Sequence, residues 1–298
     1  HVGQRRPGAA VEAFQEEAPG APGTAVELGH VGPDRPRPGQ GEDVLRPGAG
    51  TGPAADGLVV SPRTGPSEDL DTAARRYFDA DRDYAGIRER LLRDTKLRAA
   101  AGGLDGLRIL RQPPFETVIG FIVSANNNIP RITKCIGGLC RLAGRPVRID
   151  GAVEYGFPTP ESLAAFDAAT FRAEANLGYR DRYVVETASR VASGTADLEA
   201  WSDERTPRLI ENLRSLPGVG PKVAECIALF AYGRFDVFPV DTWIRQIYVE
   251  TYPLRVPAAT DRQIGERARR RFGRHAGLAQ QYLFESVRRR GRASGDQT

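Results

Sequence analysis

Lys222 and Asp241 are the two residues of this sequence whose surroundings best suit chemistry. Lys222 lies in the segment LPGVGPKVAECIALF, and Asp241 follows it by 19 residues, at the end of FPVD. Gly218 and Gly220 permit a tight turn, and Pro221 suits the first position of a helix. The pattern predicts a glycine hairpin that feeds a helix start, with free backbone N–H groups suited to a phosphate. An amine on that turn, with a carboxylate after the helix, favours chemistry on a nucleic acid.

The position of Lys222 favours a nucleophilic amine. The positive end of the helix dipole disfavours a charged ammonium there, and a neutral amine is a nucleophile. Cys226 follows one helical turn later, so the two side chains can meet. A lysine that only contacts a phosphate or solvent is the alternative.

Asp241 has two interpretations that can coexist. It precedes Trp243 and Ile244 at a predicted helix start, where aspartate is a common N-cap. Its carboxylate would also stabilise positive charge developing on a sugar, or help a nearby lysine lose its proton. Trp243 carries an indole N–H that can donate to a phosphate.

Two further motifs favour contacts with bases. In SANNNIPRI, Asn126 is the first of three asparagines after an apolar segment, and Arg131 follows them. These asparagines either cap a turn or present amide groups to a nucleic acid. In LGYRDRY, Tyr179 lies between Gly178 and Arg180, where an exposed aromatic ring can enter a base stack. A core tyrosine on a loop is the alternative.

Gln280 and Phe284 form a possible base pocket near the C-terminus. They lie four residues apart in AGLAQQYLF, on one face of a predicted helix. The amide offers a donor and an acceptor to a base edge, and the phenyl ring offers a stacking face. Taken alone, the pair fits ordinary core or surface residues equally well.

The elements that must hold these residues are predicted to be helices almost throughout. Apolar residues recur at helical spacing and strand signals are scarce, which indicates an all-α fold. A helix follows Ser67, and another carries Ile132 after the asparagines. A helix-hairpin-helix lies at about 207–232. The other predicted helices cover residues 84–98, 114–125, 160–166, 168–175, 182–193, 241–252, 261–272 and 277–289.

The N-terminal 66 residues differ from the rest of the chain. They contain 13 glycines and 10 prolines, with Phe14 as the one aromatic residue. Such a segment cannot bury enough apolar surface to offset its ordering entropy, so we predict a disordered or degenerate N-terminal domain. A small, poorly patterned β domain is the alternative. The helical domain then covers residues 67–287, and the basic residues 288–298 are expected to be a flexible tail.

Composition excludes several classes of protein. The net charge is +4, which is weak support for an anionic partner. The three cysteines, Cys135, Cys140 and Cys226, form no CxxC pair, so we expect no zinc site, no disulfide framework and a reducing compartment. No run of 18 apolar residues is present, and no signal-peptide pattern opens the chain.

Together, the motifs resemble the 8-oxoguanine DNA glycosylases of the helix-hairpin-helix superfamily. The resemblance runs from about Tyr77 to Phe284, roughly two thirds of the chain. It is carried by YFDAD, LRILRQPPFE, FIVSANNNIPRIT, GFPTPESL, LGYRDRYV, LPGVGPKVAECIALF, FPVD and AGLAQQYLF. It implies a two-lobed helical core and a base-excision-repair enzyme. Such an enzyme flips 8-oxoguanine opposite cytosine out of duplex DNA and removes it through a lysine Schiff base, with associated lyase activity.

The resemblance also implies a role for each candidate residue. Lys222 matches the attacking lysine and Asp241 the catalytic aspartate, while Gly218 and Gly220 match the hairpin that holds the strand. Gln280, Phe284 and Cys226 match the base pocket, and Tyr179 matches the wedge. The residues that match those around the orphaned cytosine are Asn126, Arg131 and Arg180. Trp243 stands where some members carry histidine. Extruding a base before its glycosidic bond is attacked fits the physics of a stacked duplex.

Cofactor, partner and compartment follow from the same resemblance. No cofactor is required, and no side chains are expected to bind a metal. A monovalent cation or calcium is expected at the backbone carbonyls of residues 215–220. The partner is double-stranded DNA with oxidised guanine, with no membrane involved, and the protein is expected to be a monomer. It would be cytoplasmic in a bacterium and nuclear in a eukaryote.

Two rival functions remain at this point. A non-catalytic helix-hairpin-helix DNA-binding module would bind without cleaving, and a superfamily glycosylase would act on another damaged purine. An iron–sulfur member is excluded because no cysteine follows Cys226, and a monofunctional alkylbase glycosylase would lack Lys222. The family's N-terminal β domain is not recognisable in residues 1–66, which puts discrimination against guanine in doubt.

Overall fold

The computed structural model describes residues 26–28, 60–62, 70–104, 106–149, 152–253 and 259–295. Their helices are α2 (Leu70–Tyr77), α3 (Tyr84–Leu91), α4 (Thr95–Ala100), α5 (Pro114–Ser124), α6 (Ile129–Ala143), α7 (Pro160–Ala164), α8 (Ala168–Glu174), α9 (Asp181–Ala192), α10 (Thr206–Arg214), α11 (Pro221–Phe230), α12 (Thr242–Thr251), α13 (Asp261–Phe272) and α14 (Ala276–Gly295). Three 3₁₀ turns are η1 (Gly178–Arg180), η2 (Ala200–Asp203) and η3 (Gly273–His275). The mainly helical fold that the sequence predicts is confirmed.

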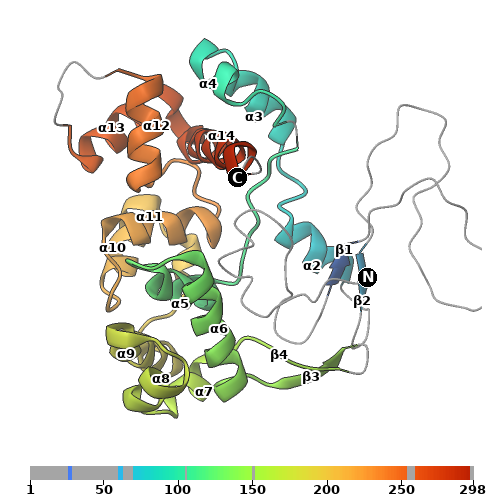
Figure 1. Ribbon diagram of the computed structural model, residues 1–298, viewed down its shortest axis with the longest axis vertical. Helices are drawn as coiled ribbons and strands as arrows, with labels where there is room; N and C mark the ends of the chain where they lie inside the picture. Colours follow the sequence, from blue (N-terminus) through green and yellow to red (C-terminus); the bar gives the residue numbers. More distant parts are fainter. Residues whose placement is uncertain are drawn as a thin grey trace, which may run out of the picture.

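The helices form two groups with the helical hairpin between them. Figure 1 shows α3, α4, α12, α13 and α14 at one end and α7, α8 and α9 at the other. Helices α10 and α11 lie between these ends, beside α5. This arrangement brings the α11 hairpin within reach of side chains from both groups.

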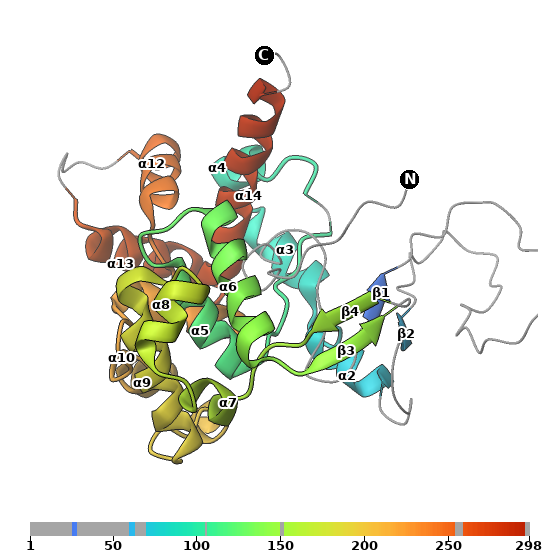
Figure 2. The ribbon, with the colours of Figure 1, turned by 60° about the horizontal axis from the view of Figure 1, so that its bottom comes forward.

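Two short antiparallel hairpins of strands accompany the helices. Strands β3 (Pro146–Ile149) and β4 (Ala152–Tyr155) pair with Val147 opposite Glu154, and they extend from the ends of α6 and α7 away from α8 and α9 (Figure 2). Strands β1 (Val26–Leu28) and β2 (Val60–Pro62) pair with Glu27 opposite Ser61. The sequence analysis predicted neither pair, because strands of three or four residues are too short for alternation to register.

One predicted helix is divided in two. A single helix was expected over residues 84–98, but α3 ends at Leu91 and α4 begins at Thr95. The Asp94 carboxylate accepts hydrogen bonds from the backbone N–H groups of Lys96 (3.0 Å) and Leu97 (2.9 Å), which starts a new helix. Further on, α14 continues past Arg288 to Gly295, into the expected tail. The flexibility of that tail stays a prediction. The expected cap at Ser67 and most of residues 1–66 lie outside the described residues.

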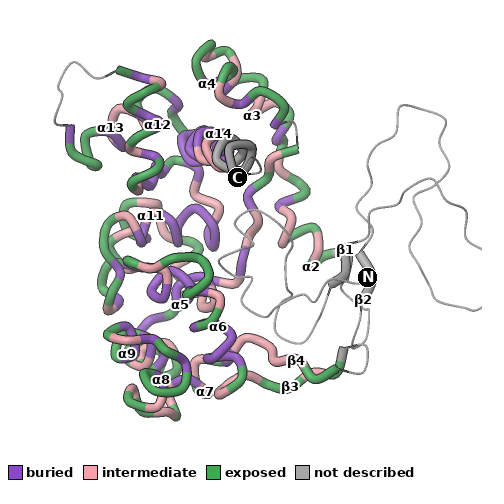
Figure 3. Tube along the Cα trace, in the orientation of Figure 1, coloured by how far each residue is buried: buried purple, intermediate pink, exposed green. Residues whose placement is uncertain are grey.

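The core is continuous through the three helices around the hairpin. Figure 3 shows burial concentrated in α5, α11 and the first turns of α14. Val118, Ile227 and Leu283, one from each of these helices, have no solvent-exposed surface. The Phe121 and Phe230 rings join α5 to α11 at 6.0 Å between centroids. Burial of such side chains stabilises by about 1.5–3 kcal/mol each and fixes α11 in place. No helix of the described ranges combines the length and apolarity needed to cross a membrane.

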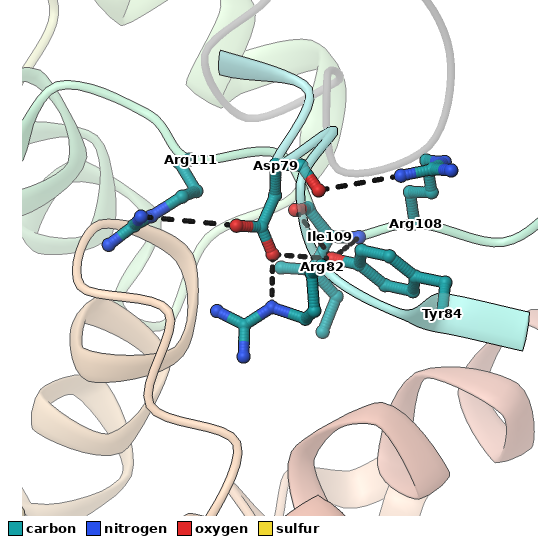
Figure 4. Close-up of polar contacts among 6 residues, drawn as sticks. All are labelled: Asp79, Arg82, Tyr84, Arg108, Ile109 and Arg111. Carbon is teal, nitrogen blue, oxygen red and sulfur yellow. Dashed lines mark hydrogen bonds and ion pairs between the residues drawn. The ribbon is translucent and has the colours of Figure 1, made fainter. Parts of the chain in front are cut away.

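Asp79 organises a cluster of arginines that reaches the loop after α11 (Figure 4). Its side chain accepts hydrogen bonds from Arg82 and from the Tyr84 hydroxyl (3.1 Å), and it pairs with Arg111 at 3.9 Å. The Arg82 guanidinium in turn lies 4.2 Å from the centre of the Phe235 ring. The YFDAD motif therefore holds the start of the loop that leads to Asp241.

We expect Asp79→Asn to destabilise the protein by about 2 kcal/mol, because the partly exposed Arg82 and Arg111 lose their charged partner. Only 9% of the Asp79 side chain is exposed, and asparagine tolerates its φ of +48°, so the change removes charge without adding strain. Thermal unfolding would show a Tm lower by roughly 4–8 °C. The control is Asp81→Asn, since the Asp81 side chain is 72% exposed and pairs with an exposed Arg75. Equal Tm values for the two variants would contradict the role of Asp79.

Candidate active site

The glycine hairpin forms as its composition predicts. The chain turns after α10, and Gly218 adopts a φ of +78°, which a residue with a Cβ resists. Gly220 occupies the N-cap of α11 without a side-chain cap, and Pro221 follows at the first helical position. The first N–H groups of α11 therefore lack a side-chain partner at the cap and suit an anion.

Lys222 is the second residue of α11 and is partly exposed. Its Nζ lies 5.8 Å from the centre of the Phe121 ring of α5. The amine also contacts the Cys226 thiol one turn along the same helix. Phe121 and Cys226 thus bound the side chain on its protein side and leave the amine at the edge of the core.

Cys226 is a neutral neighbour rather than a rival nucleophile. Burial raises the pKa of the Cys226 thiol to about 11, although the nearby Lys222 acts to lower it. The thiolate is the reactive form of cysteine. At neutral pH the thiol stays protonated, so the amine of Lys222 is the nucleophile that this site offers.

Asp241 ends the buried loop 237–240 and begins α12. Its carboxylate accepts a 2.7 Å hydrogen bond from the backbone N–H of Ile244, so it is an N-cap. The residue is partly exposed, and its charge acts on the Cys226 thiol. Lys222, Cys226 and Asp241 therefore lie together. Asp241 fits both interpretations, since it caps the helix and its charge reaches Cys226, the neighbour of Lys222.

Gln280 of α14 is hydrogen-bonded to loop 237–240, which ends at Asp241. Its amide Nε2 donates to the carbonyl of Pro239 at 3.3 Å, and its Oε1 accepts from Gln281 at 2.6 Å. These two bonds leave one N–H and one lone pair of the amide for a ligand. Phe284 follows one turn later on α14 and is partly buried. A base edge and a base face thus have candidate partners on one helix.

Of the three asparagines, two make hydrogen bonds that shape the turn before α6. The Asn127 amide donates to the Val123 carbonyl (3.0 Å), and the Asn128 side chain caps α6 by accepting from the Arg131 N–H (3.0 Å). Asn126 has a φ of +50° and an exposed side chain. The turn interpretation holds for Asn127 and Asn128, and contact with a nucleic acid stays a prediction for the exposed Asn126.

Arg180 lies deeper than the sequence analysis expected. Its side chain is 2% exposed and donates to the carbonyls of Ala125 (2.9 and 2.5 Å) and Asn126 (2.7 Å). It therefore holds the loop that carries Asn126. Arg131 is exposed, with its guanidinium above Gly178: a Cβ at Gly178 would lie 3.6 Å from it.

Two of the candidate residues are exposed aromatic side chains. Tyr179 is 53% exposed, with the Arg180 guanidinium 4.5 Å from its ring centre. Trp243, in the first turn of α12 after Asp241, is 58% exposed. Both positions suit contact with a nucleic acid. Sequence reasoning missed Tyr183, which is exposed beside Tyr179; its signal was the four-residue spacing in LGYRDRY.

Comparisons with known proteins show which proteins this chain is similar to. A family model described as "8-oxoguanine DNA glycosylase, N-terminal domain" matches residues 50–118. The match overlaps residues 50–66, part of the segment 1–66 in which the sequence analysis recognised no pattern of this domain. A probable N-glycosylase/DNA lyase of Methanothermobacter thermautotrophicus is 36% identical over 219 residues, covering 67% of this chain and 69% of the relative.

The chain belongs to the 8-oxoguanine DNA glycosylase/DNA lyase family. An N-glycosylase/DNA lyase of Saccharomyces cerevisiae is 33% identical, and the match covers 64% of this chain but 54% of the relative. The chain thus spans about half the length of that yeast relative. The structure of Clostridium acetobutylicum 8-oxoguanine glycosylase/lyase, with double-stranded DNA containing cytosine opposite 8-oxoguanine, superposes with a TM-score of 0.74. It is 35% identical and covers 80% of this chain and 81% of that chain.

Proposed function

We propose that this protein removes 8-oxoguanine opposite cytosine from duplex DNA and then cleaves the strand by β-elimination. The observation that carries the proposal is the grouping of Lys222, Cys226 and Asp241 at the hairpin of a chain from this family. A DNA-binding module needs the hairpin N–H groups, but it needs neither the amine nor the carboxylate. The catalytic interpretation accounts for the hairpin N–H groups, the amine and the carboxylate.

In this mechanism the Lys222 amine attacks C1′ of the damaged nucleoside, and the bond from C1′ to the base breaks. The base leaves with the electron pair of that bond and with one proton of the amine. The C1′–O4′ bond of the resulting aminal then breaks, O4′ takes the second amine proton, and the lysine is joined to C1′ as a Schiff base. Loss of a C2′ proton then expels the 3′ phosphate, which nicks the strand. Asp241 stabilises positive charge on the sugar as the base departs. Gln280 bonds the edge of the extruded base, and Phe284 packs against its face.

Borohydride reduction tests the proposal directly. A duplex with 8-oxoguanine opposite cytosine should yield a covalent protein–DNA complex, because borohydride reduces the Schiff base to a stable amine. Release of 8-oxoguanine without a trapped complex would refute the lysine mechanism. Binding with neither release nor trapping would favour the non-catalytic module. Trapping on other damaged purines, with none on 8-oxoguanine, would favour a different lesion.

We expect Arg131→Ala to reduce the preference for cytosine opposite the lesion. An arginine that donates two hydrogen bonds to a base contributes about 1–3 kcal/mol of discrimination, so the ratio of excision rates should fall roughly tenfold. Arg131 suits the test because it is exposed, whereas Arg180→Ala would also release the loop at Asn126. Single-turnover excision opposite each of the four bases measures the ratio. An unchanged ratio would remove Arg131 from cytosine recognition.

The hairpin cation and the monomer are further parts of the proposal. The Ser215 carbonyl accepts from the Arg190 guanidinium at 2.9 Å, and the Leu216 carbonyl accepts from the Val219 N–H at 3.2 Å. Two carbonyls of residues 215–220 thus have protein donors, and each keeps a lone pair for a cation. The chemistry above needs no cation. A monomer is expected because one chain supplies the lysine, the aspartate and the glutamine.

A further inference from the structure

One tyrosine ring joins the two parts of the surface that the proposed function places against DNA. Tyr183 lies in the first turn of α9 and is 37% exposed. Its ring is packed on the backbone of Gly218 in the hairpin. A Cβ at Gly218 would lie 2.7 Å from Cδ2 and 3.0 Å from Cγ of Tyr183. Glycine at this position therefore serves two needs, a φ of +78° and room for the ring.

The Tyr183 ring also packs against the wedge residue. Tyr179 and Tyr183 are edge to face, with centroids 6.2 Å apart and an interplanar angle of 80°. Tyr179 is itself held, because its hydroxyl donates to the Ala125 carbonyl at 3.3 Å. A continuous series of contacts thus runs from the loop after α5, through Tyr179 and Tyr183, to Gly218.

Extruding a base requires stiffness between two points of contact with DNA. The hairpin holds a phosphate of the damaged strand, and the wedge enters the base stack. Unstacking costs a few kcal/mol, which the protein supplies by bending the duplex between such contacts. If the hairpin and the wedge move independently, the protein deforms in place of the duplex, and the base stays stacked. An aromatic ring packed on backbone has few torsions and resists such movement.

We propose that Tyr183 is a positioning residue that sets the separation between the wedge Tyr179 and the hairpin at Gly218. It acts on extrusion of the base and not on the chemistry at Lys222. This inference rests on the proposed function, because it assigns Tyr183 a part in the same reaction. The competing view is that Tyr183 only supports the hairpin, in which case every reaction of Lys222 would depend on it equally.

The test compares two substrates on each protein preparation. One duplex carries 8-oxoguanine opposite cytosine, and the other carries an abasic site opposite cytosine, which has no base to unstack. Tyr183→Leu should lower single-turnover excision of 8-oxoguanine about tenfold, corresponding to loss of the edge-to-face pair and its packing. Nicking at the abasic site should change less than about threefold. Tyr183→Phe keeps the ring and should match the wild type on both substrates.

Each outcome decides the question. Equal losses on the two substrates, or no loss on either, would overturn the inference. The ratio of the two rates is independent of the folded fraction, so a less stable Tyr183→Leu preparation still gives an answer. If the wild type nicks abasic sites but does not release 8-oxoguanine, the proposed lesion is wrong. In that case the comparison is repeated on the lesion that is released.

Discussion

Lys222→Gln is expected to abolish borohydride trapping and strand nicking while leaving duplex binding nearly unchanged. In the proposed mechanism the amine is the nucleophile, and glutamine of similar length cannot form a Schiff base. Loss of a covalent nucleophile should lower excision by at least about 10⁴-fold. Binding relies on the N–H groups of α11 and on other contacts, so affinity for an abasic-analogue duplex should fall less than about threefold. Gel-shift binding and single-turnover excision measure the two effects.

Lys96 supplies a matched control for this substitution. Both lysines are the second residue of a helix, and both lie over an aromatic ring, Lys222 at 5.8 Å from Phe121 and Lys96 at 5.7 Å from Tyr252. Lys96→Gln changes the net charge equally and should leave excision and trapping intact. A parallel loss of binding and trapping in Lys222→Gln would mean that Lys222 is only a phosphate contact.

The placement of Lys222 and its neighbours could be predicted from sequence because it depends on local geometry. A glycine turn, a proline at the first helical position and a cysteine one turn later place Lys222 beside Cys226 in any helix of this sequence. Asp241 is predictable for the same reason, since an N-cap is a local signal. The structure adds that the Pro239 carbonyl, in the loop before Asp241, is the acceptor for Gln280.

The surroundings of Arg180 and Tyr183 could not be predicted in this way. Arg180 donates to carbonyls 54 and 55 residues earlier in the chain, and the ring of Tyr183 lies on a glycine of a different motif. Periodicity shows which face of its own helix a residue occupies, but not which distant backbone meets it. The break between α3 and α4 had a local signal in Asp94, which the apolar spacing through Leu92 concealed.

The second large effect is expected at Asp241, where the substitution can separate the two roles of the carboxylate. Asparagine caps helices as well as aspartate does, so Asp241→Asn should keep the hydrogen bond from the Ile244 N–H. It removes the negative charge that acts on Cys226, the neighbour of Lys222. Charge that develops on the sugar then lacks its stabilising partner, and excision should fall by about 10²–10³-fold. The free energy of unfolding should change by less than about 0.5 kcal/mol.

Two further variants complete the separation. Asp241→Ala should lose activity like Asp241→Asn and also about 1 kcal/mol of stability, because the cap is gone. Asp167→Asn is the remote control, since Asp167 caps α8 through the Thr170 N–H at 2.7 Å, and it should leave excision unchanged. Full activity in Asp241→Asn would reduce Asp241 to a helix cap. Low activity with an unchanged unfolding free energy would instead assign the loss to the missing charge, since asparagine still caps α12 in that variant.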